Sequence, residues 1–380
     1  MKKVFSLFLS VLMLCGVFCR YTNAAEFTDE LDCRSAILIE TSTMNVLYEK
    51  NADTSYPPAS VTKIMTLLLV AEAIDSGKTS LNDTVTASDN ASKMGGSQVY
   101  LKAGEQMSMS DMIKSVAVAS ANDCAVALAE HISGSEASFV VQMNERAKEL
   151  GMKNTNFENV TGLDDTVKNH VTSARDIAIM SAELLKHKFI FDYTTIWMDT
   201  VRNGAFGLTN TNRLIRFYKG ANGLKTGMTQ KAGFCVSAAA KRGDMQLIAV
   251  IMGAPSRDIR NNAASRLLDF GFANYGLYSV NSDELSPIRL TGGVNKELKI
   301  RHGDFSALLP QTEIRSVTYE TELSENVSAP VKKGDVIGKI EFFSNGKPIG
   351  QTDITADEDA PEIKFGDMFI KLLSKFLMIR

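Results

Sequence analysis

The sequence is poor in residues that usually bind metal ions, and its charge is nearly balanced. Its four histidines are scattered and no H-E-x-x-H or paired-cysteine motif occurs, which argues against a zinc enzyme. The net charge is −3 without a strongly basic field, which argues against nucleic acid as a partner. Five cysteines are an odd number and suggest no disulfide framework. The sequence therefore predicts neither a metal site nor a cofactor.

A hydrophobic run long enough to cross a membrane is also lacking. The apolar run Val4–Cys19 is shorter than the roughly 20 residues that a spanning helix needs. It lies between the charged pair Lys2-Lys3 and the small residues Ala24-Ala25, a layout typical of a secretory signal peptide. We therefore expect residues 1–25 to be removed, the alternative being a retained anchor. The cysteines that remain, whose pairing the sequence leaves open, are Cys33, Cys124 and Cys235.

The rest of the composition is that of a globular protein. Hydrophobic residues make up 44% and charged residues 22%, and 380 residues allow two domains or three. Strand-like runs at Ser35–Glu40 and Asn45–Lys50 precede a series of helices, the first of them the apolar Ile64–Ile74. The strand pair Gly233–Ala240 and Met245–Gly253 follows. This order predicts an α/β fold of the α+β kind, an antiparallel sheet covered by helices and built from both ends of the segment.

The character of the sequence changes near Tyr278. Short β-rich segments separated by turn residues predict a small all-β domain at residues 284–356, after a first domain at residues 26–278. An acidic linker leads to residues 362–380, where polar residues recur at spacings of three and four. That spacing predicts a C-terminal amphipathic helix with a wide apolar face. Such a helix is typical of attachment to a membrane surface, and packing on the all-β domain is the alternative.

Ser60 and Lys63 form an S-x-x-K motif where the predicted buried helix begins. Residues three apart lie on the same face of a helix, so the hydroxyl and the amine can meet. Serine is a weak nucleophile that needs a base, and a buried lysine can be that base because desolvation lowers its pKa. A second copy of the motif, Ser344–Lys347, lies on a predicted β-turn, and we interpret it as structural.

Two further motifs follow in the chain. Ser120 and Asn122 form an S-x-N motif at the break between two apolar helices, where side chains can point into a cleft; a helix cap is the alternative. Other S-x-N triplets, such as Ser88–Asn90, lack this setting. Lys225-Thr226-Gly227 is the only K-T-G and opens a predicted strand. A strand edge can pair with an extended peptide, and lysine and threonine can hold a carboxylate.

The order S-x-x-K, S-x-N and K-T-G, on helix, loop and strand, resembles that of the serine penicillin-recognising enzymes. The surrounding segments Tyr56–Thr66, Ser120–Asp123, Phe157–Asn159 and Gly223–Gly227 narrow the resemblance to the low-molecular-mass penicillin-binding proteins that act as D-alanyl-D-alanine carboxypeptidases. The resemblance runs from about Phe27 to the end of the chain. It implies a transpeptidase/β-lactamase-like fold and a serine hydrolase that removes the terminal D-alanine of peptidoglycan stem peptides, limiting cross-linking.

The resemblance implies roles for the residues of the first two motifs. Ser60 would be the nucleophile that forms the acyl-enzyme, and Lys63 its general base. Ser120 and Asn122 would relay a proton and orient the substrate. The oxyanion hole would consist of the backbone N–H groups of Ser60 and Met228. The family often has histidine at the position of Met228, a departure that leaves the backbone donor intact.

The third motif is implied to bind the substrate. Lys225 and Thr226 would face the terminal carboxylate of the peptide, Arg260 would assist them, and Gly227 would let the backbone of the strand come close to the substrate. His170 resembles a family position that we interpret as structural.

The partners implied are the peptidoglycan stem peptide, β-lactams as covalent inhibitors and a membrane surface on the outer, extracytoplasmic side. A β-lactamase shares the three motifs, but the E-x-x-L-N run of class A enzymes is absent. A non-catalytic penicillin-binding wall module would lack the serine or the lysine, and both are present. The sequence does not reveal the preferred stem peptide, the growth stage of use, the role of the all-β domain or the oligomeric state.

Overall fold

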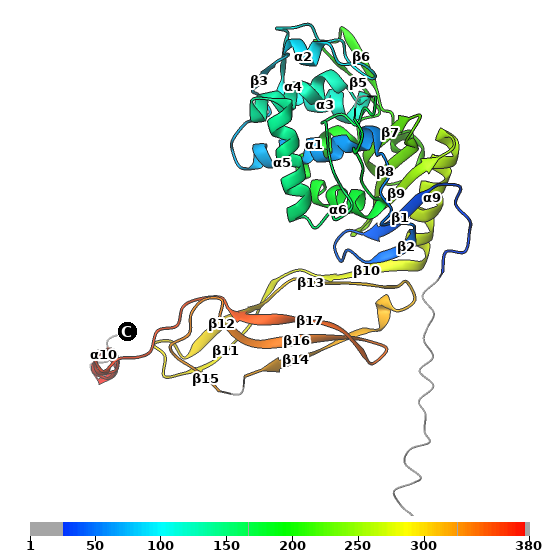
Figure 1. Cartoon of the computed structure of the whole chain (residues 1–380). Helices are drawn as coiled ribbons and strands as arrows, with labels where there is room; N and C mark the ends of the chain where they lie inside the picture. The colour runs from blue at the N-terminus through cyan, green and yellow to red at the C-terminus, as the bar shows by residue number, and fades with distance from the viewer. Residues whose placement is uncertain (1–25, 166, 325, 377–380) are drawn as a thin grey trace, which may run out of the picture.

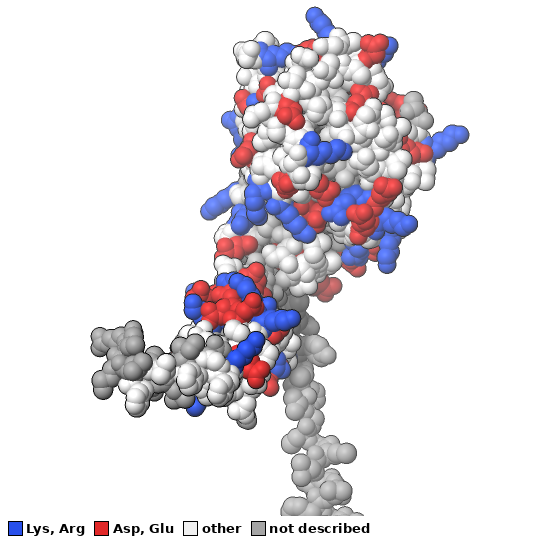
Figure 2. Space-filling view, turned by 90° about the vertical axis from the view of Figure 1, so that its left-hand side faces the viewer, with Lys and Arg blue, Asp and Glu red and all other residues white. Residues whose placement is uncertain are grey.

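The computed structural model describes residues 26–165, 167–324 and 326–376. They form a rounded α+β part and an elongated all-β part (Figure 1). The predicted signal peptide, residues 1–25, lies outside the described residues. On the face seen in Figure 2, basic and acidic side chains are interspersed over the α+β part.

The α+β part is built on a five-stranded antiparallel sheet with the order β2-β1-β9-β8-β7. Successive side chains of a strand point to opposite faces. Along β9, Ile248 and Val250 therefore join the core on one face of the sheet, and Leu247 and Ala249 join the core on the other. The strands are β1 Ser35–Glu40, β2 Val46–Lys50, β7 Ala221–Thr229, β8 Gly233–Arg242 and β9 Met245–Ala254.

Helices cover both faces of this sheet (Figure 1). Helix α9 packs on β8 and β9 on one face, and α6 packs on β1 and β9 on the other. Helix α1 lies against α6 and is buried on nearly all sides, as its apolar sequence predicts. The helices are η1 Ala59–Thr62, α1 Lys63–Asp75, α2 Asp89–Ser92, α3 Met109–Ala119, α4 Asn122–Ser133, α5 Glu136–Glu149, α6 Ala174–Leu184 and α9 Arg257–Asn274.

Smaller elements lie between these helices and the K-T-G strand. Strands β5 and β6 pair as an antiparallel hairpin, and a short loop and α8 connect the hairpin to β7. This segment therefore lies beside the strand that carries the third motif. The elements are β3 Thr84–Thr86, β4 Gln106–Ser108, η2 Lys188–Ile190, α7 Phe191–Thr194, β5 Met198–Val201, β6 Phe206–Thr209 and α8 Leu214–Phe217.

The all-β part begins where α9 ends. It contains a six-stranded sheet with the order β14-β16-β17-β12-β11-β15 and the pair β10-β13. Phe305 and Phe342 stack in its core with ring centroids 4.1 Å apart. The predicted fold class is thus confirmed. The elements are β10 Tyr275–Val280, β11 Asp283–Thr291, β12 Glu297–His302, β13 Phe305–Pro310, η3 Ile314–Ser316, β14 Val317–Leu323, β15 Val327–Ser328, β16 Val336–Ser344 and β17 Lys347–Ala356.

A single helix, α10 (Phe365–Phe376), follows at the end of the all-β part that is remote from the α+β part (Figure 1). Phe365 and Phe376 are 82% and 86% exposed, and Met368, Phe369 and Leu373 are also exposed. Among the described residues, no helix combines the length and the apolarity needed to cross a membrane.

Candidate active site

Ser60 and Lys63 meet where two helical segments join. Ser60 lies in η1 and Lys63 is the first residue of α1, so a single helical turn separates them. Lys63 Nζ is hydrogen-bonded to Ser60 Oγ at 2.9 Å and donates to the carbonyl oxygen of Thr161 at 2.8 Å. The second bond fixes the amine in place, so the lysine is held in position to exchange a proton with the serine.

The environment of Lys63 favours its neutral form. The side chain is fully buried, and desolvation is the largest cause that lowers its pKa well below the usual value. The positive charge of Lys225 lowers the pKa further, and the carboxylate of Asp123 opposes this effect. A neutral amine beside a serine hydroxyl can accept its proton, which is what a general base must do.

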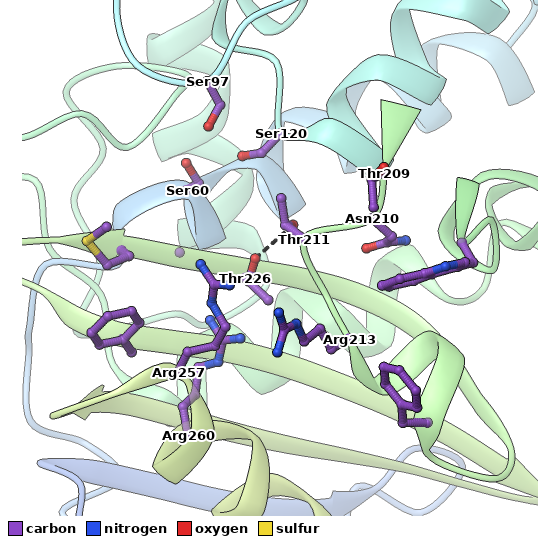
Figure 3. A pocket seen from close by; sticks show the side chains of 15 residues that line it. Ser60, Ser97, Ser120, Thr209, Asn210, Thr211, Arg213, Thr226, Arg257 and Arg260 are labelled. Atoms are coloured by element: carbon purple, nitrogen blue, oxygen red, sulfur yellow. Dashed lines mark hydrogen bonds between the residues drawn. The ribbon is translucent and has the colours of Figure 1, made fainter. Parts of the chain in front are cut away.

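Ser120 and Asn122 lie at the junction between α3 and α4. Ser120 ends α3 in the left-handed conformation with φ 64°, and α4 begins at Asn122. Asn122 Nδ2 donates to the carbonyl oxygen of Gly95 at 2.7 Å, while its buried Oδ1 has no hydrogen-bond partner among the described residues. In Figure 3, Ser120 lies beside Ser60 on the same side of the pocket, facing Thr226. Ser120 is the C-cap residue of α3 through its backbone, while no capping hydrogen bond of its hydroxyl to α3 or α4 occurs among the described residues.

The K-T-G strand lies directly against the segment that carries Ser60. A Cβ atom added at Gly227 would stand 2.7 Å from the carbonyl oxygen of Pro58 and 2.9 Å from the backbone nitrogen of Ser60. Only glycine permits this approach of β7 to η1. Thr226 Oγ1 donates to Thr211 Oγ1 at 2.8 Å, and Lys225 Nζ donates to the carbonyl oxygen of Thr226 at 2.9 Å.

These segments surround a cleft of about 680 Å³ (Figure 3). The three motifs contribute Ser60, Ser120, Thr226 and Gly227 to its wall. The remaining lining residues are Ser97, Trp197, Thr209, Asn210, Thr211, Arg213, Phe217, Met228, Phe234, Arg257 and Arg260. Of the other sequence-predicted site residues, Lys63 and Lys225 do not line the cavity but are hydrogen-bonded to Ser60 and Thr226, which do, and Asn122 does not line it.

The wall of the cleft next to Thr226 is strongly basic. Arg260 is almost fully buried; desolvation and the nearby charge of Arg257 lower its pKa to about 10. Lys225 is also buried; desolvation and the charge of Arg260 lower its pKa to about 7. The guanidinium groups of Arg213 and Arg257 are exposed in the cleft. An anion entering here would relieve the repulsion among these cations.

Hydrogen bonds to neighbouring residues fix the side chain of Arg260. Its Nη2 donates to Asn261 Oδ1 at 2.8 Å, and its Nη1 donates to the carbonyl oxygen of Cys235 at 3.4 Å. For Arg213 and Arg257, no side-chain hydrogen bond or ion pair occurs among the described residues. Their donors are free for a ligand, which makes them site residues that the sequence motifs did not reveal.

His170 and Ser344 have structural contacts. His170 Nδ1 accepts a hydrogen bond from the backbone of Glu158, so Nε2 carries the proton and donates to Thr62 Oγ1 at 2.7 Å. Burial lowers the pKa of His170 to about 4, so the ring is neutral. Ser344 Oγ donates to Glu313 Oε2 at 3.0 Å at the end of β16. Neither residue lines the cleft.

The chain was compared with known protein families and proteins. Residues 22–256 match a family described as D-alanyl-D-alanine carboxypeptidase, and residues 283–362 match the penicillin-binding protein 5 C-terminal domain. The chain is 41% identical over 347 residues to the D-alanyl-D-alanine carboxypeptidase DacF of Bacillus subtilis, covering 89% of each protein. It is 35% identical over 368 residues to DacC of Escherichia coli, covering 93% of this chain and 91% of DacC.

Solved structures give the same result. Penicillin-binding protein 5 from Haemophilus influenzae has a TM-score of 0.75 and 32% identity, over 89% of this chain and 100% of that structure. Penicillin-binding protein D2 from Listeria monocytogenes in its ampicillin-bound form has a TM-score of 0.60 and 31% identity, over 65% of this chain and 100% of that structure. On these matches, the chain belongs to the D-alanyl-D-alanine carboxypeptidase family of penicillin-binding proteins.

Proposed function

We propose that the protein removes the C-terminal D-alanine from peptidoglycan stem peptides ending in D-Ala-D-Ala, through an acyl-enzyme on Ser60. The observation that carries this proposal is the 2.9 Å hydrogen bond between Ser60 and the buried Lys63, whose pKa is well below the usual value. Family membership supplies the reaction. This chemistry needs no metal ion, because the serine, the base and the anion-binding groups all come from side chains and backbone.

In the proposed acylation step, Lys63 accepts the proton of Ser60 as Oγ attacks the carbonyl of the penultimate D-alanine. The backbone N–H groups of Ser60 and Met228 would stabilise the oxyanion that forms. Ser120 would pass a proton to the leaving amine, and Asn122 would orient the peptide. The C–N bond breaks, D-alanine leaves, and water then hydrolyses the ester.

The terminal carboxylate of the substrate would lie at Thr226. The buried cations Lys225 and Arg260 lie beside this position, and the free guanidinium groups of Arg213 and Arg257 add positive charge to the same wall of the cleft. Hydrogen bonds from charged donors bind a carboxylate more strongly than hydrogen bonds from neutral donors do. We propose that these groups select peptides with a free C-terminus, and that β-lactams acylate the same serine.

The protein would work on the outer face of the cytoplasmic membrane. The N-terminal sequence has the layout of a signal peptide, and the substrate class lies outside the cytoplasm. We propose that α10 attaches the enzyme to the membrane surface, because its described side chains include three exposed phenylalanines. An amphipathic helix lies in the interface plane with its apolar face among the lipids.

Release of the C-terminal residue from two matched tripeptides, as D-alanine from one and as D-alaninamide from the other, tests the proposed substrate recognition. One ends in D-Ala-D-Ala with a free carboxylate, and the other is its C-terminal amide. Arg260→Ala should lower kcat/KM for the free acid by about ten- to a hundredfold, the range of charge-assisted hydrogen bonds, and affect the amide much less. An equal loss on both peptides would assign Arg260 a structural role instead.

A further inference from the structure

A second cavity, of about 700 Å³, lies outside the catalytic cleft and shares no lining residue with it. We call it the second pocket. The C-terminal end of α6, the helical segments that follow it, the β1–β2 and β8–β9 turns and the start of β7 form its wall. Its volume falls within the roughly 300–1,000 Å³ of pockets that bind small organic ligands. The second pocket is therefore large enough for a ligand of its own.

A pair of amide side chains forms part of this wall. The register of β7 against β8 shifts between Ala221 and Gly223, which makes Asn222 the extra residue of a β-bulge. A bulge turns a side chain away from the direction that a regular strand would give it. Asn222 Nδ2 donates to Oε1 of the buried Gln246 at 2.8 Å, and Gln246 Nε2 donates to Asn222 Oδ1 at 3.2 Å. The amide of Asn222 is thus fixed where it lines the second pocket.

Asn222 keeps hydrogen-bonding capacity for a ligand. An amide group has two N–H donors and an oxygen with two lone pairs, and the pair with Gln246 uses one of each at Asn222. No further hydrogen bond of the Asn222 side chain occurs among the described residues. The remaining N–H and lone pair are complementary to the C=O and N–H of a peptide group, so Asn222 can bind one.

Charged groups of both signs border the second pocket. Lys188, Lys241 and Asp244 line it and are exposed. Within the part of the chain that the structure describes, none of these three side chains has a hydrogen bond or an ion pair. Lys186, which also lines the pocket, is paired with Glu183 at 2.6 Å. Two free ammonium groups and one free carboxylate are complementary to a ligand that carries carboxylates and an ammonium group together.

The second pocket also has an apolar side. Ala182 and Leu185, at the end of α6, are buried, and Phe191 is half-buried beside them in the lining. A bare inorganic ion would gain nothing from these side chains. Apolar walls with a few fixed polar groups are typical of sites for small organic molecules. The ligand that fits therefore has an aliphatic part in addition to its charges and its amide group.

Strand β7 connects the second pocket with the catalytic cleft. It contributes Asn222 to the pocket and Thr226 to the cleft, about 13 Å apart along an extended strand. Thr194 Oγ1 donates to the carbonyl oxygen of Asn222 at 2.6 Å, and Asn212 Nδ2 donates to that of Gly223 at 2.9 Å. These bonds fix the first part of β7. A ligand in the second pocket would therefore be held at a short, constant distance from the cleft.

We propose that the second pocket is a binding site for a short zwitterionic peptide. An amide group of the peptide bonds to Asn222, and its carboxylates lie at Lys188 and Lys241. Its ammonium group pairs with Asp244, and its aliphatic part packs on Leu185. A peptidoglycan stem peptide whose diamino acid keeps a free amine has all of these groups. This choice of source rests on the proposed function, and the pocket would hold one stem peptide of the wall while the cleft trims another.

Isothermal titration calorimetry tests the proposal with N-acetyl-L-Ala-γ-D-Glu-L-Lys, which lacks the D-Ala-D-Ala ending, and with its Nε-acetylated form, which lacks the ammonium group. The protein is first treated with benzylpenicillin to block the cleft at Ser60, and mass spectrometry reports the adduct. We expect saturable binding of the tripeptide at one site, and binding of the Nε-acetylated form that is weaker by up to about fivefold, as for an exposed ion pair. No saturable binding of the tripeptide, or equal binding of both forms, would overturn the inference. A missing adduct would instead contradict the proposed acyl-enzyme, and the variants below would still locate the bound peptide.

Variants of the lining locate the bound peptide. The double variant Lys188→Ala, Lys241→Ala should weaken tripeptide binding at least about fivefold. Asp244→Asn should weaken binding of the tripeptide but not that of the Nε-acetylated form, because only the tripeptide has the ammonium group. The double variant Lys148→Ala, Lys153→Ala removes the same charge from exposed positions outside the pocket and should bind as the wild type does. Thermal unfolding reports that each variant is folded. Wild-type affinity in folded Lys188→Ala, Lys241→Ala would contradict the site.

Discussion

Two buried lysines lie behind the lining of the cleft, Lys63 bonded to Ser60 and Lys225 to Thr226, and losing a proton has a different consequence for each. Lys63 contacts the nucleophile and has a pKa well below the usual value, because it is desolvated and lies near the charge of Lys225. Lys225 titrates at about 7, next to the buried Arg260. Burial thus makes Lys63 a base. It leaves Lys225 close enough to neutrality that an arriving anion can favour its protonated form.

Replacing Lys63 by arginine tests the base. A guanidinium stays protonated at any usable pH, so Lys63→Arg should acylate with a β-lactam about 10²–10⁴-fold more slowly, the usual contribution of a general base. In the wild type, the acylation rate should rise with pH as Lys63 deprotonates. The rate should reach its plateau at a pH below the pKa of an ordinary lysine, because the pKa of Lys63 is lowered. Stopped-flow acylation measures both. Near-wild-type acylation by Lys63→Arg would remove Lys63 from the mechanism.

Lys225 should make the stability of the protein depend on pH. Its folded pKa of about 7 is lower than its unfolded value of 10.5, so the unfolded chain binds more protons between these values. The free energy of unfolding should therefore rise with pH from about 7 to about 10, by at most about 1.4 kcal/mol per pH unit from this group. Urea denaturation should show a smaller rise in Lys225→Met. Lys219→Met, which replaces an exposed lysine, is the control and should keep the wild-type dependence of the free energy of unfolding on pH. If Lys225→Met also kept it, the lowered pKa of Lys225 would be contradicted.

At the scale of elements, the site depends on how closely β7 approaches η1. Gly227 permits that contact, because a Cβ atom there would stand 2.7 Å from the backbone of Pro58. Gly227→Ala should push the strand away from Ser60 and lower the acylation rate by at least about tenfold, since small misplacements of reacting groups are costly. Gly207→Ala in β6, where a Cβ atom would meet nothing within 4 Å, is the control. Unchanged kinetics in Gly227→Ala would show that this contact is not needed.

The sequence predicted the elements whose patterns are local. The apolar runs of α1, β8 and β9 are recognisable without knowledge of their partners, and the three motifs identify a site by residue type. Helix α6 and the hairpin β5–β6 were not predicted. Helix α6 is mostly apolar and Ser173 caps its N-terminus, so its local signal was overlooked, whereas the hairpin strands are short and depend on packing against α3. Arg213 and Arg257 were missed because tertiary structure alone brings them to the cleft.

At the scale of the whole molecule, the all-β part separates the catalytic cleft from α10 (Figure 1). Helix α10 projects exposed apolar side chains, among them Phe365, Phe369 and Phe376. If α10 is the attachment to the membrane, the all-β part holds the cleft away from the lipid surface and toward the wall.

Removing residues 365–380 tests this arrangement. The truncated chain ends at Lys364, so the hydrogen bond that the backbone of Ile363 donates to the carbonyl oxygen of Gly292 stays in place. We expect the truncated protein to lose binding to vesicles of phosphatidylglycerol and phosphatidylcholine, because the apolar helix surface is gone, and to keep its rate on short peptides. Phe369→Asp should weaken binding in the intact chain. Sedimentation with vesicles that is equal for truncated and intact protein would contradict the attachment role.

The central claim is that Ser60 carries the acyl-enzyme, and mass spectrometry after exposure to benzylpenicillin tests it most directly. We expect one adduct, located on Ser60, and expect Ser60→Ala to lose both the adduct and D-alanine release. Ser344→Ala, which alters the other S-x-x-K serine, should keep both the adduct and the release. An adduct on any serine other than Ser60, or D-alanine release that survives in Ser60→Ala, would contradict the account.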